Sequence, residues 1–264
     1  MKRIYDELCD IVRRAGEIIL GAHDLDNDGA VSLKSGDPAN LVTVYDTRTQ
    51  AFIIDEILSL IPEAVFIAEE KDNDNSVLSS EYCFIIDPID GTANFVHDYR
   101  HSCISLALFS HGVARYAIIY DPYLDELFTA EEGGGAYLNG ERISTSEREP
   151  KLAMVAFGTA PYKKEALAAP TFALAEKLFR HCRDVRRCGT AALDLAYLAA
   201  GRNDIFFEYS LSPWDIAAGA LIVKEAGGIV SNAAGKVHRY EAPEPVFAAN
   251  KKCHAFLLAK AAEI

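Results

Sequence analysis

Two aspartates stand three residues apart in the stretch FIIDPIDGTANF, which covers residues 84–95. The apolar residues at its start predict a buried strand, and Asp87 and Asp90 follow where that strand runs out. One interpretation is a turn, because Asp-Gly is a common hairpin signal and proline interrupts strands. The other is a metal site, because carboxylates are the ligands that hard divalent cations prefer.

Other acids favour the metal site. Asp46 ends a second predicted strand, and Glu69 with Glu70 ends a third. Asp215 opens a predicted helix directly after the single tryptophan. Carboxylates that crowd together without a cation raise one another's pKa, so acids that converge from separate strand ends indicate a cation between them. A turn explains Asp90 but none of the other acids.

Gly91 and Thr92 supply the remaining chemistry. They predict the start of a helix, where free backbone N–H groups favour a phosphate. Thr92 is expected to cap that helix or to orient a water molecule with its hydroxyl. Divalent metals, an anion-binding turn and a hydroxyl beside water are what metal-assisted hydrolysis of a phosphate ester requires.

The elements that must position these residues follow from periodicity and from turn signals. Helices are predicted at 4–19, 47–61, 171–179, 191–201, 214–228 and 251–262. Strands are predicted at 41–46, 65–70, 84–86, 102–109, 113–122, 125–132, 152–158, 184–188 and 204–209, and further strands within 133–143 on either side of a tight turn at Asn139-Gly140. The polar stretch ISTSEREP predicts a boundary near residue 148. We therefore expect one domain with an α+β lobe (1–147) and an α/β lobe (148–264), tightly joined.

Charge and cysteine usage restrict the function classes. The 264 residues hold 39 acidic residues against 26 Lys and Arg, a net charge of −13, which disfavours nucleic-acid binding through overall positive charge. A local patch of Arg180, Arg183, Arg186 and Arg187 stays possible. The six cysteines form no paired motif, the start of the chain lacks a secretion-signal pattern, and no stretch has the length and apolarity of a membrane span. We expect a cytoplasmic enzyme without a membrane partner.

Two other metal patterns are weaker. Residues 24–35 imitate a calcium loop with Asp24, Asp26 and Asp28, but Ser35 stands where the loop needs a glutamate. His97 and His101 have the spacing of zinc ligands only if they share a helix. We interpret the first as a solvated loop and the second as a pair of surface or loop histidines.

The sequence resembles the inositol monophosphatase family, in the group of lithium-sensitive, Mg2+-dependent sugar phosphatases. DPIDGTANF is similar to its first signature and WDIAAGALIVKEAGG to its second. The stretch from Lys34 to Asp46, FIAEE and RRCGTAALDLA also match in order. The resemblance implies a layered αβαβα sandwich, commonly a homodimer, and inhibition by lithium.

The resemblance also implies two or three Mg2+ ions. Glu69, Asp87 and the carbonyl of Ile89 would hold one ion. Asp87, Asp90 and Asp215 would hold the second, and Glu69 with water molecules a weaker third. No covalent intermediate is implied.

The other roles that the resemblance implies concern water and substrate. Thr92, paired with Asp46, would orient and help to deprotonate the attacking water, and the backbone of Gly91 and Thr92 would bind the phosphate. The residues that would receive the alcohol are Glu208, Gly189, Thr190 and Ala191, with Thr159 as a further candidate.

The expected activity is hydrolysis of a polyol or sugar phosphate, with inositol 1-phosphate as the first candidate. Fructose-1,6-bisphosphatase and 3′-phosphoadenosine-5′-phosphatase activities are alternatives, although Ala93-Asn94 favours the inositol and sugar branch. A non-enzymatic role with RNA polymerase or RNA is a further alternative, since some bacterial relatives serve there. The loop ANFVHDYRH departs from the family pattern, and so do Ala68 and Lys71, but these changes remove no ligand.

Overall fold

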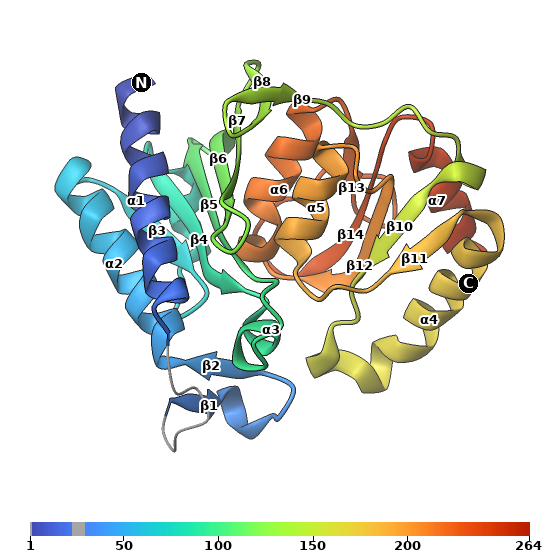
Figure 1. Ribbon diagram of the computed structural model, residues 1–264, viewed down its shortest axis with the longest axis horizontal. Helices are drawn as coiled ribbons and strands as arrows, with labels where there is room; N and C mark the ends of the chain where they lie inside the picture. The colour runs from blue at the N-terminus through green and yellow to red at the C-terminus, as the bar shows by residue number, and fades with distance from the viewer. Residues whose placement is uncertain (1, 23–29) are drawn as a thin grey trace.

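The computed structural model describes residues 2–22 and 30–264, and within them it forms five alternating layers of helices and sheets (Figure 1). The calcium-like aspartates Asp24, Asp26 and Asp28 lie outside the described residues. No helix in the described part is both long and apolar enough to cross a membrane. The predicted αβαβα sandwich is confirmed.

The first large sheet has seven strands in the order β3-β4-β5-β6-β7-β8-β9. Its strands are β3 (Val65–Ala68), β4 (Cys83–Asp90), β5 (Cys103–Ser110), β6 (Val113–Asp121), β7 (Glu126–Glu131), β8 (Gly135–Leu138) and β9 (Glu141–Ile143). Only β3 and β4 pair in parallel; the remaining pairs are antiparallel. Short connections join the strands from β5 to β9, as expected for hairpins and meanders, whereas the connection from β4 to β5 contains the short helix α3 (Thr92–Val96).

The second large sheet has five strands in the order β11-β10-β12-β14-β13. Its strands are β10 (Met154–Phe157), β11 (Asp184–Arg186), β12 (Ile205–Leu211), β13 (Ile229–Ser231) and β14 (Glu244–Ala249). Strands β10, β11 and β12 are parallel, and β14 is antiparallel to both of its neighbours. A separate hairpin pairs β1 (Val31–Leu33) with β2 (Leu41–Thr43).

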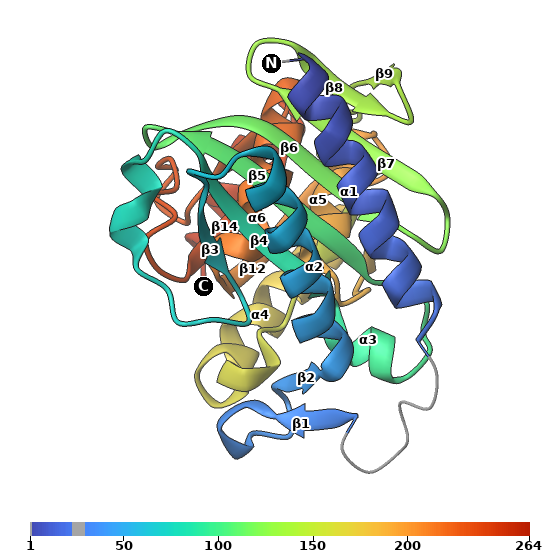
Figure 2. The same cartoon turned by 90° about the vertical axis from the view of Figure 1, so that its left-hand side faces the viewer.

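The helices cover these sheets in three layers. Their bounds are α1 (Lys2–Leu20), α2 (Val44–Leu60), α3 (Thr92–Val96), α4 (Lys164–His181), α5 (Ala191–Ala199), α6 (Pro213–Glu225) and α7 (His254–Ala261), with short 3-10 turns at Lys34–Gly36, Asn75–Ser79, Pro150–Leu152 and Pro161–Lys163. Helices α1 and α2 cross the outer face of the seven-stranded sheet (Figure 2). Helices α5 and α6 fill the space between the sheets, and α4 with α7 covers the outer face of the five-stranded sheet.

Alternation along β4 explains how one strand serves two cores. Cys83 and Ile85 join the cluster around α5 and α6, whereas Phe84 and Ile86 join the cluster under α1 and α2. Successive strand residues point to opposite faces, and this strand is buried on both. The next residue in this alternation, Asp87, therefore points toward α5 and α6.

Several predicted bounds are wrong. The strand predicted at 41–46 ends at Thr43, because Thr43 and Asp46 form a capping box that starts α2. Helix α4 begins well before the predicted residue 171, and Pro170 lies inside it. Strands β13 and β14 were not predicted, because short apolar runs between loops carry weak periodicity.

Candidate active site

A pocket of about 320 Å3 opens between the end of β4 and the N-termini of α5 and α6. Its lining includes, from the residues predicted above, Glu69, Asp87, Ile89, Asp90, Gly91, Thr92, Gly189, Thr190, Ala191, Glu208 and Asp215. Asp46 lies one hydrogen bond behind this lining. The structure thus brings together residues that are up to 169 positions apart in the chain (46 to 215).

A bulge in β4 aims Asp87 and Asp90 at the same side. Asp87 pairs with Ser105 and Asp90 with Cys103, so three steps along β4 oppose two steps along β5. Residues three apart in a regular strand face opposite sides, and the extra residue of a bulge corrects this. The Pro-containing sequence between the two aspartates is therefore a bulge rather than a hairpin turn.

Helix N-termini hold two of the acids. The backbone N–H of Ala192, in the first turn of α5, donates to Asp90 Oδ2 at 2.6 Å. Asp215 lies in the first turn of α6, where its Oδ2 accepts from the backbone N–H of the N-cap residue Ser212 at 2.7 Å. A carboxylate near a helix N-terminus is stabilised by the free N–H groups and by the helix dipole.

The electrostatics of these acids are unfavourable without a cation. Burial raises the pKa of Asp87 well above its usual range, and the charges of Glu69, Asp90 and Asp215 raise it further. Burial also raises the pKa of Asp90 to about 8, although the hydrogen bond from Ala192 acts to lower it. The pKa of Asp215 is raised in the same way, by burial and then by Asp90 and Glu69. Bound divalent cations would lower these raised pKa values, because they stabilise the charged carboxylates.

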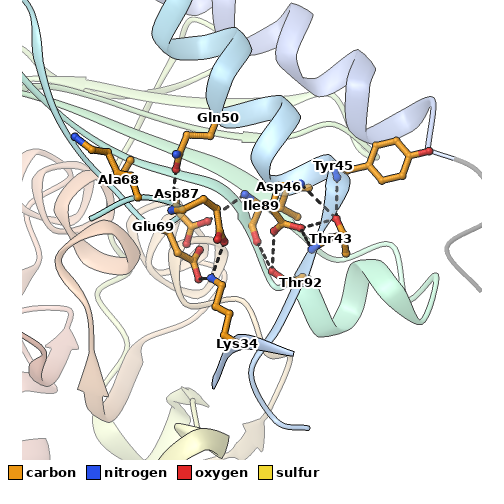
Figure 3. Close-up of polar contacts among 12 residues, drawn as sticks. Lys34, Thr43, Tyr45, Asp46, Gln50, Ala68, Glu69, Asp87, Ile89 and Thr92 are labelled. Carbon is orange, nitrogen blue, oxygen red and sulfur yellow. Dashed lines mark hydrogen bonds and ion pairs between the residues drawn. The ribbon is translucent and has the colours of Figure 1, made fainter. Parts of the chain in front are cut away.

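Lys34 supplies one positive charge from the β1–β2 hairpin. Its Nζ lies 2.7 Å from Glu69 Oε1 and 2.6 Å from Glu70 Oε1 (Figure 3). Burial lowers the pKa of Lys34, but the two glutamates more than offset this, so the pKa is raised. Lys34 therefore neutralises the strand-end glutamates, while Asp87, Asp90 and Asp215 form no ion pair among the described residues.

Thr92 and Asp46 make contact at the edge of the pocket. Thr92 Oγ1 donates to Asp46 Oδ1 at 3.1 Å, and the Ile89 carbonyl is a second acceptor at 3.1 Å (Figure 3). The other oxygen of Asp46 accepts from the N–H and the hydroxyl of Thr43, at 2.8 Å and 2.5 Å. Burial raises the pKa of Asp46 to about 6, which suits a group that takes a proton near neutral pH.

Glu208 forms the opposite wall of the pocket. Its Oε1 accepts from the N–H of Ala160 at 2.8 Å, and a side chain at Gly158 would lie 1.8 Å from its Oε2. Ala160 has a φ of +40°, a left-handed conformation that L-residues adopt rarely. Burial raises the pKa of Glu208 to about 8, against that hydrogen bond. The β10–α4 connection thus holds the carboxylate of Glu208, a residue of β12, at the pocket and at some cost in backbone strain.

Close packing joins the turn at Gly91 to the segment at Thr190, which precedes α5. Gly91 has a φ of +90°, and a Cβ there would lie 2.5 Å from Thr190 Oγ1. Asn94 Nδ2 donates to the carbonyls of His101 and Cys188 at 2.8 Å and 2.9 Å, and to Thr190 at 3.1 Å. Asn94 was not predicted as a site residue, although it lies inside the first signature.

Three more lining residues were not assigned a role from the sequence: Arg187, Tyr162 and Asp194. Tyr162 follows Pro161 in the wall around Glu208, and no motif marks it. Arg187 lies in the matching stretch RRCGTAALDLA, so the sequence did offer a reason to consider it.

The predicted histidine pair does not form a zinc site on one helix. His97 follows the last residue of α3, and His101 contacts Tyr99 and Tyr197, so the two histidines share no helix.

The donor set fits Mg2+. All of the acids offer hard oxygen ligands, and their burial without counter-charge calls for a cation. Within residues 2–22 and 30–264, no three His, Cys, Asp or Glu side chains enclose a metal position by themselves. Mg2+ usually binds through few carboxylates and completes its shell with water and substrate phosphate. The arrangement suits hydrolysis of a phosphate ester.

Comparisons with known proteins agree with this chemistry. The Nus factor SuhB of Escherichia coli (strain K12) is 40% identical over 248 residues, which cover 94% of this chain and 91% of that protein. The extragenic suppressor protein suhB of Bartonella henselae superposes with a TM-score of 0.88 at 33% identity, over 98% of both chains. An IMPase of Thermotoga maritima superposes with a TM-score of 0.86 at 33% identity, over 100% of this chain and 98% of that one.

The family model for the inositol monophosphatases matches residues 1–264. Both signatures lie in the pocket lining, the first at the end of β4 and the second at the start of α6. This chain belongs to the inositol monophosphatase family.

Proposed function

We propose that this protein is a Mg2+-dependent phosphomonoesterase that acts on a polyol or sugar phosphate, with inositol 1-phosphate as the first candidate. One observation carries the proposal: buried Asp87 and half-buried Asp90 and Asp215, which form no ion pair among the described residues, line the same pocket as Thr92. The hydroxyl of Thr92 in turn donates to Asp46. Membership of the family supports it.

The metal ligands in this proposal are side chains and one carbonyl. Glu69, Asp87 and the Ile89 carbonyl would hold one ion, and Asp87, Asp90 and Asp215 a second. When bound, Mg2+ would neutralise the phosphate and make a water molecule more acidic. A third and weaker position at Glu69 would compete with Lys34, whose ammonium lies 2.7 Å from Glu69 Oε1.

Thr92 and Asp46 would prepare the attacking water. The Thr92 hydroxyl donates to Asp46, so its lone pairs are free to accept a proton from water while its own proton moves to Asp46 Oδ1. The pKa of Asp46, raised to about 6, supports the role of a base at neutral pH. The proton would then rest on Asp46 until the product leaves.

The remaining residues would position the ester. The backbone of Gly91 and Thr92 would bind phosphate oxygens, and Glu208 with Gly189, Thr190 and Ala191 would receive the alcohol. Support comes from the pocket, which all six residues line. The pocket also draws residues from both 1–147 and 148–264, which supports one domain made of two joined lobes.

The test is phosphate release from a panel of esters, with Mg2+ and with excess chelator. The panel holds inositol 1-phosphate, fructose 1,6-bisphosphate, 3′-phosphoadenosine 5′-phosphate and histidinol phosphate. Turnover that needs Mg2+ and is lost in Asp90→Asn supports the proposal. Equal turnover in chelator would contradict it. Lithium at millimolar concentration is expected to inhibit, as the family membership implies.

A second candidate function rests on the relatives named Nus factor SuhB. Under this proposal the chain also binds a transcription complex, alone or as a homodimer in the cytoplasm, through a surface away from the pocket. Co-purification with RNA polymerase by the Asp90→Asn variant would support a binding role that is separate from hydrolysis. No polymerase binding by the wild-type protein would contradict it.

A further inference from the structure

The pocket has a basic side chain on its alcohol side. Among the described residues, Lys34 and Arg187 are the two basic side chains that line the pocket. Lys34 is engaged by Glu69 and Glu70, on the phosphate side. Arg187 follows β11 and forms no ion pair with a described carboxylate, so its charge is available to a ligand.

Two neighbours hold the guanidinium at the pocket wall. Arg187 Nη2 donates to Thr159 Oγ1 at 3.0 Å. Its Nη1 lies over Gly189, where a Cβ would come within 2.5 Å of that atom. Gly189 has a φ of +90°, so any other residue there would be strained as well as crowded. The arginine is therefore oriented but still exposed to solvent.

The surroundings of Arg187 are acidic. Its charge acts on the buried acids Glu208 and Asp194, and it lowers the pKa of both against the raising effect of burial. An alcohol that carries only hydroxyl groups could bind to this acidic wall through hydrogen bonds alone. Glu208 supplies an acceptor for such a bond. A guanidinium fork suits a different group, because its planar N–H pairs match phosphate and carboxylate oxygens.

We propose that Arg187 is a specificity-determining residue that selects phosphate esters whose alcohol part carries a second anionic group, a phosphate or a carboxylate. This inference rests on the proposed function, because it concerns the alcohol end of the same pocket. Arg187 binds the second anion, while the metal side holds the phosphate that is cleaved.

The experiment compares two pairs of esters that differ in the second anion alone. Glycerol 2-phosphate is paired with glycerate 2-phosphate, and inositol 1-phosphate with inositol 1,4-bisphosphate. We expect the anionic member of at least one pair to have a kcat/KM at least about tenfold higher, mainly through KM. The carboxylate pair and the phosphate pair identify which anion is recognised.

Variants of Arg187 test whether its guanidinium causes the preference for the anionic ester. Arg187→Ala is expected to bring the anionic-to-neutral ratio of kcat/KM close to one, and Arg187→Lys to recover part of it, since lysine keeps the charge without the fork. Arg186→Ala is the matched control, because Arg186 is exposed, pairs with Asp184 and does not line the pocket. It should keep the wild-type ratio.

Four outcomes separate the two proposals. A wild-type kcat/KM for the anionic ester that is equal to or below that for the neutral ester in both pairs, or equal losses on both members in Arg187→Ala, would overturn the role of Arg187 and leave the phosphatase intact. An equal fall of the anionic-to-neutral ratio of kcat/KM in Arg186→Ala would also overturn the role of Arg187, because general surface charge would then explain the preference. No Mg2+-dependent turnover of any ester would contradict the proposed function itself.

Discussion

The Thr92 hydroxyl lies 3.1 Å from Asp46 Oδ1 and so joins the start of α3, just after β4, to the first turn of α2. The two residues are 46 positions apart in sequence. Asp46 is fully buried and its second oxygen is engaged by Thr43, so its geometry is fixed before any substrate arrives. Fixed geometry at a proton acceptor is what general base catalysis requires.

Loss of this contact should reduce the chemical step. Thr92→Val keeps the shape of the side chain and removes the hydroxyl, so we expect kcat to fall by about 100-fold or more with Mg2+ saturating. Thr92→Ser keeps the hydroxyl and should retain much of the activity. Circular dichroism checks that both variants fold. Equal activity in Thr92→Val and Thr92→Ser would remove the hydroxyl from the mechanism.

The metal-free protein should lose stability as the pH rises. Burial raises the pKa of Asp90 from 3.8 to about 8 and that of Glu208 from 4.5 to about 8. Between about 4 and about 8 the folded state therefore binds more protons than the unfolded chain, so the free energy of unfolding falls with pH across this window. Thermal melts at pH 5, 6, 7 and 8 in excess chelator measure the slope.

Mg2+ should reduce that slope, because a bound cation stabilises the charged carboxylates. Asp90→Asn removes one titrating group and should flatten the slope in chelator. A metal-free protein that gains stability from pH 5 to pH 8 would contradict the electrostatics described for the pocket.

Removal of the Lys34 ammonium should destabilise the metal-free protein. Lys34→Met keeps the stem and leaves the partly buried carboxylates of Glu69 and Glu70 without their hydrogen-bond donor, which we expect to cost about 1–3 kcal/mol. Mg2+ should narrow the difference from wild type, since it supplies the missing positive charge. A variant whose melting temperature equals that of wild type in chelator would show that the ion pairs contribute nothing.

Loss of Asp204, which accepts several hydrogen bonds away from the pocket, should change the stability of the protein and not its activity. Asp204 is fully buried and accepts from Arg148 Nε at 2.9 Å and 3.0 Å, and from the N–H of Met154 at 2.6 Å. It also accepts from Ser146, so it ties the segment before β10 to β12. Asp204→Ala should cost about 3–5 kcal/mol, because it leaves buried donors unpaired. Turnover per folded molecule at low temperature should stay near the wild-type value.

The sequence indicated most of the layers and the acids of the pocket, for reasons that differ from element to element. Buried strands such as 84–86 and long amphipathic helices such as α1 carry strong periodicity. The bulge between Asp87 and Asp90 carries none, since it depends on how β5 pairs with β4. Asp46 was assigned to a strand because LVTV has a high strand propensity, whereas the capping box at Thr43 decides the local structure.

The residues that are proposed to receive the alcohol were harder to predict. Glu208 and residues 189–191 came from the family resemblance, and the wall that holds Glu208 came only from the structure. Ala160 adopts its positive φ because the Glu208 carboxylate and the turn into α4 fix it there, which no local pattern reports. Arg187 belongs to the matching stretch RRCGTAALDLA and to the basic patch considered from the sequence, but neither assigns it a role, because its place in the pocket depends on Thr159, 28 positions earlier.

The measurement that tests the central claim most directly is phosphate release from inositol 1-phosphate by wild type and Asp90→Asn, with a Mg2+ titration and with excess chelator. We predict saturable Mg2+-dependent turnover in the wild type, none in chelator, and a loss of at least about 100-fold in Asp90→Asn with the fold intact. Turnover that survives chelator, or wild-type activity in the folded Asp90→Asn protein, would contradict the assignment of this pocket as a metal-dependent phosphatase site.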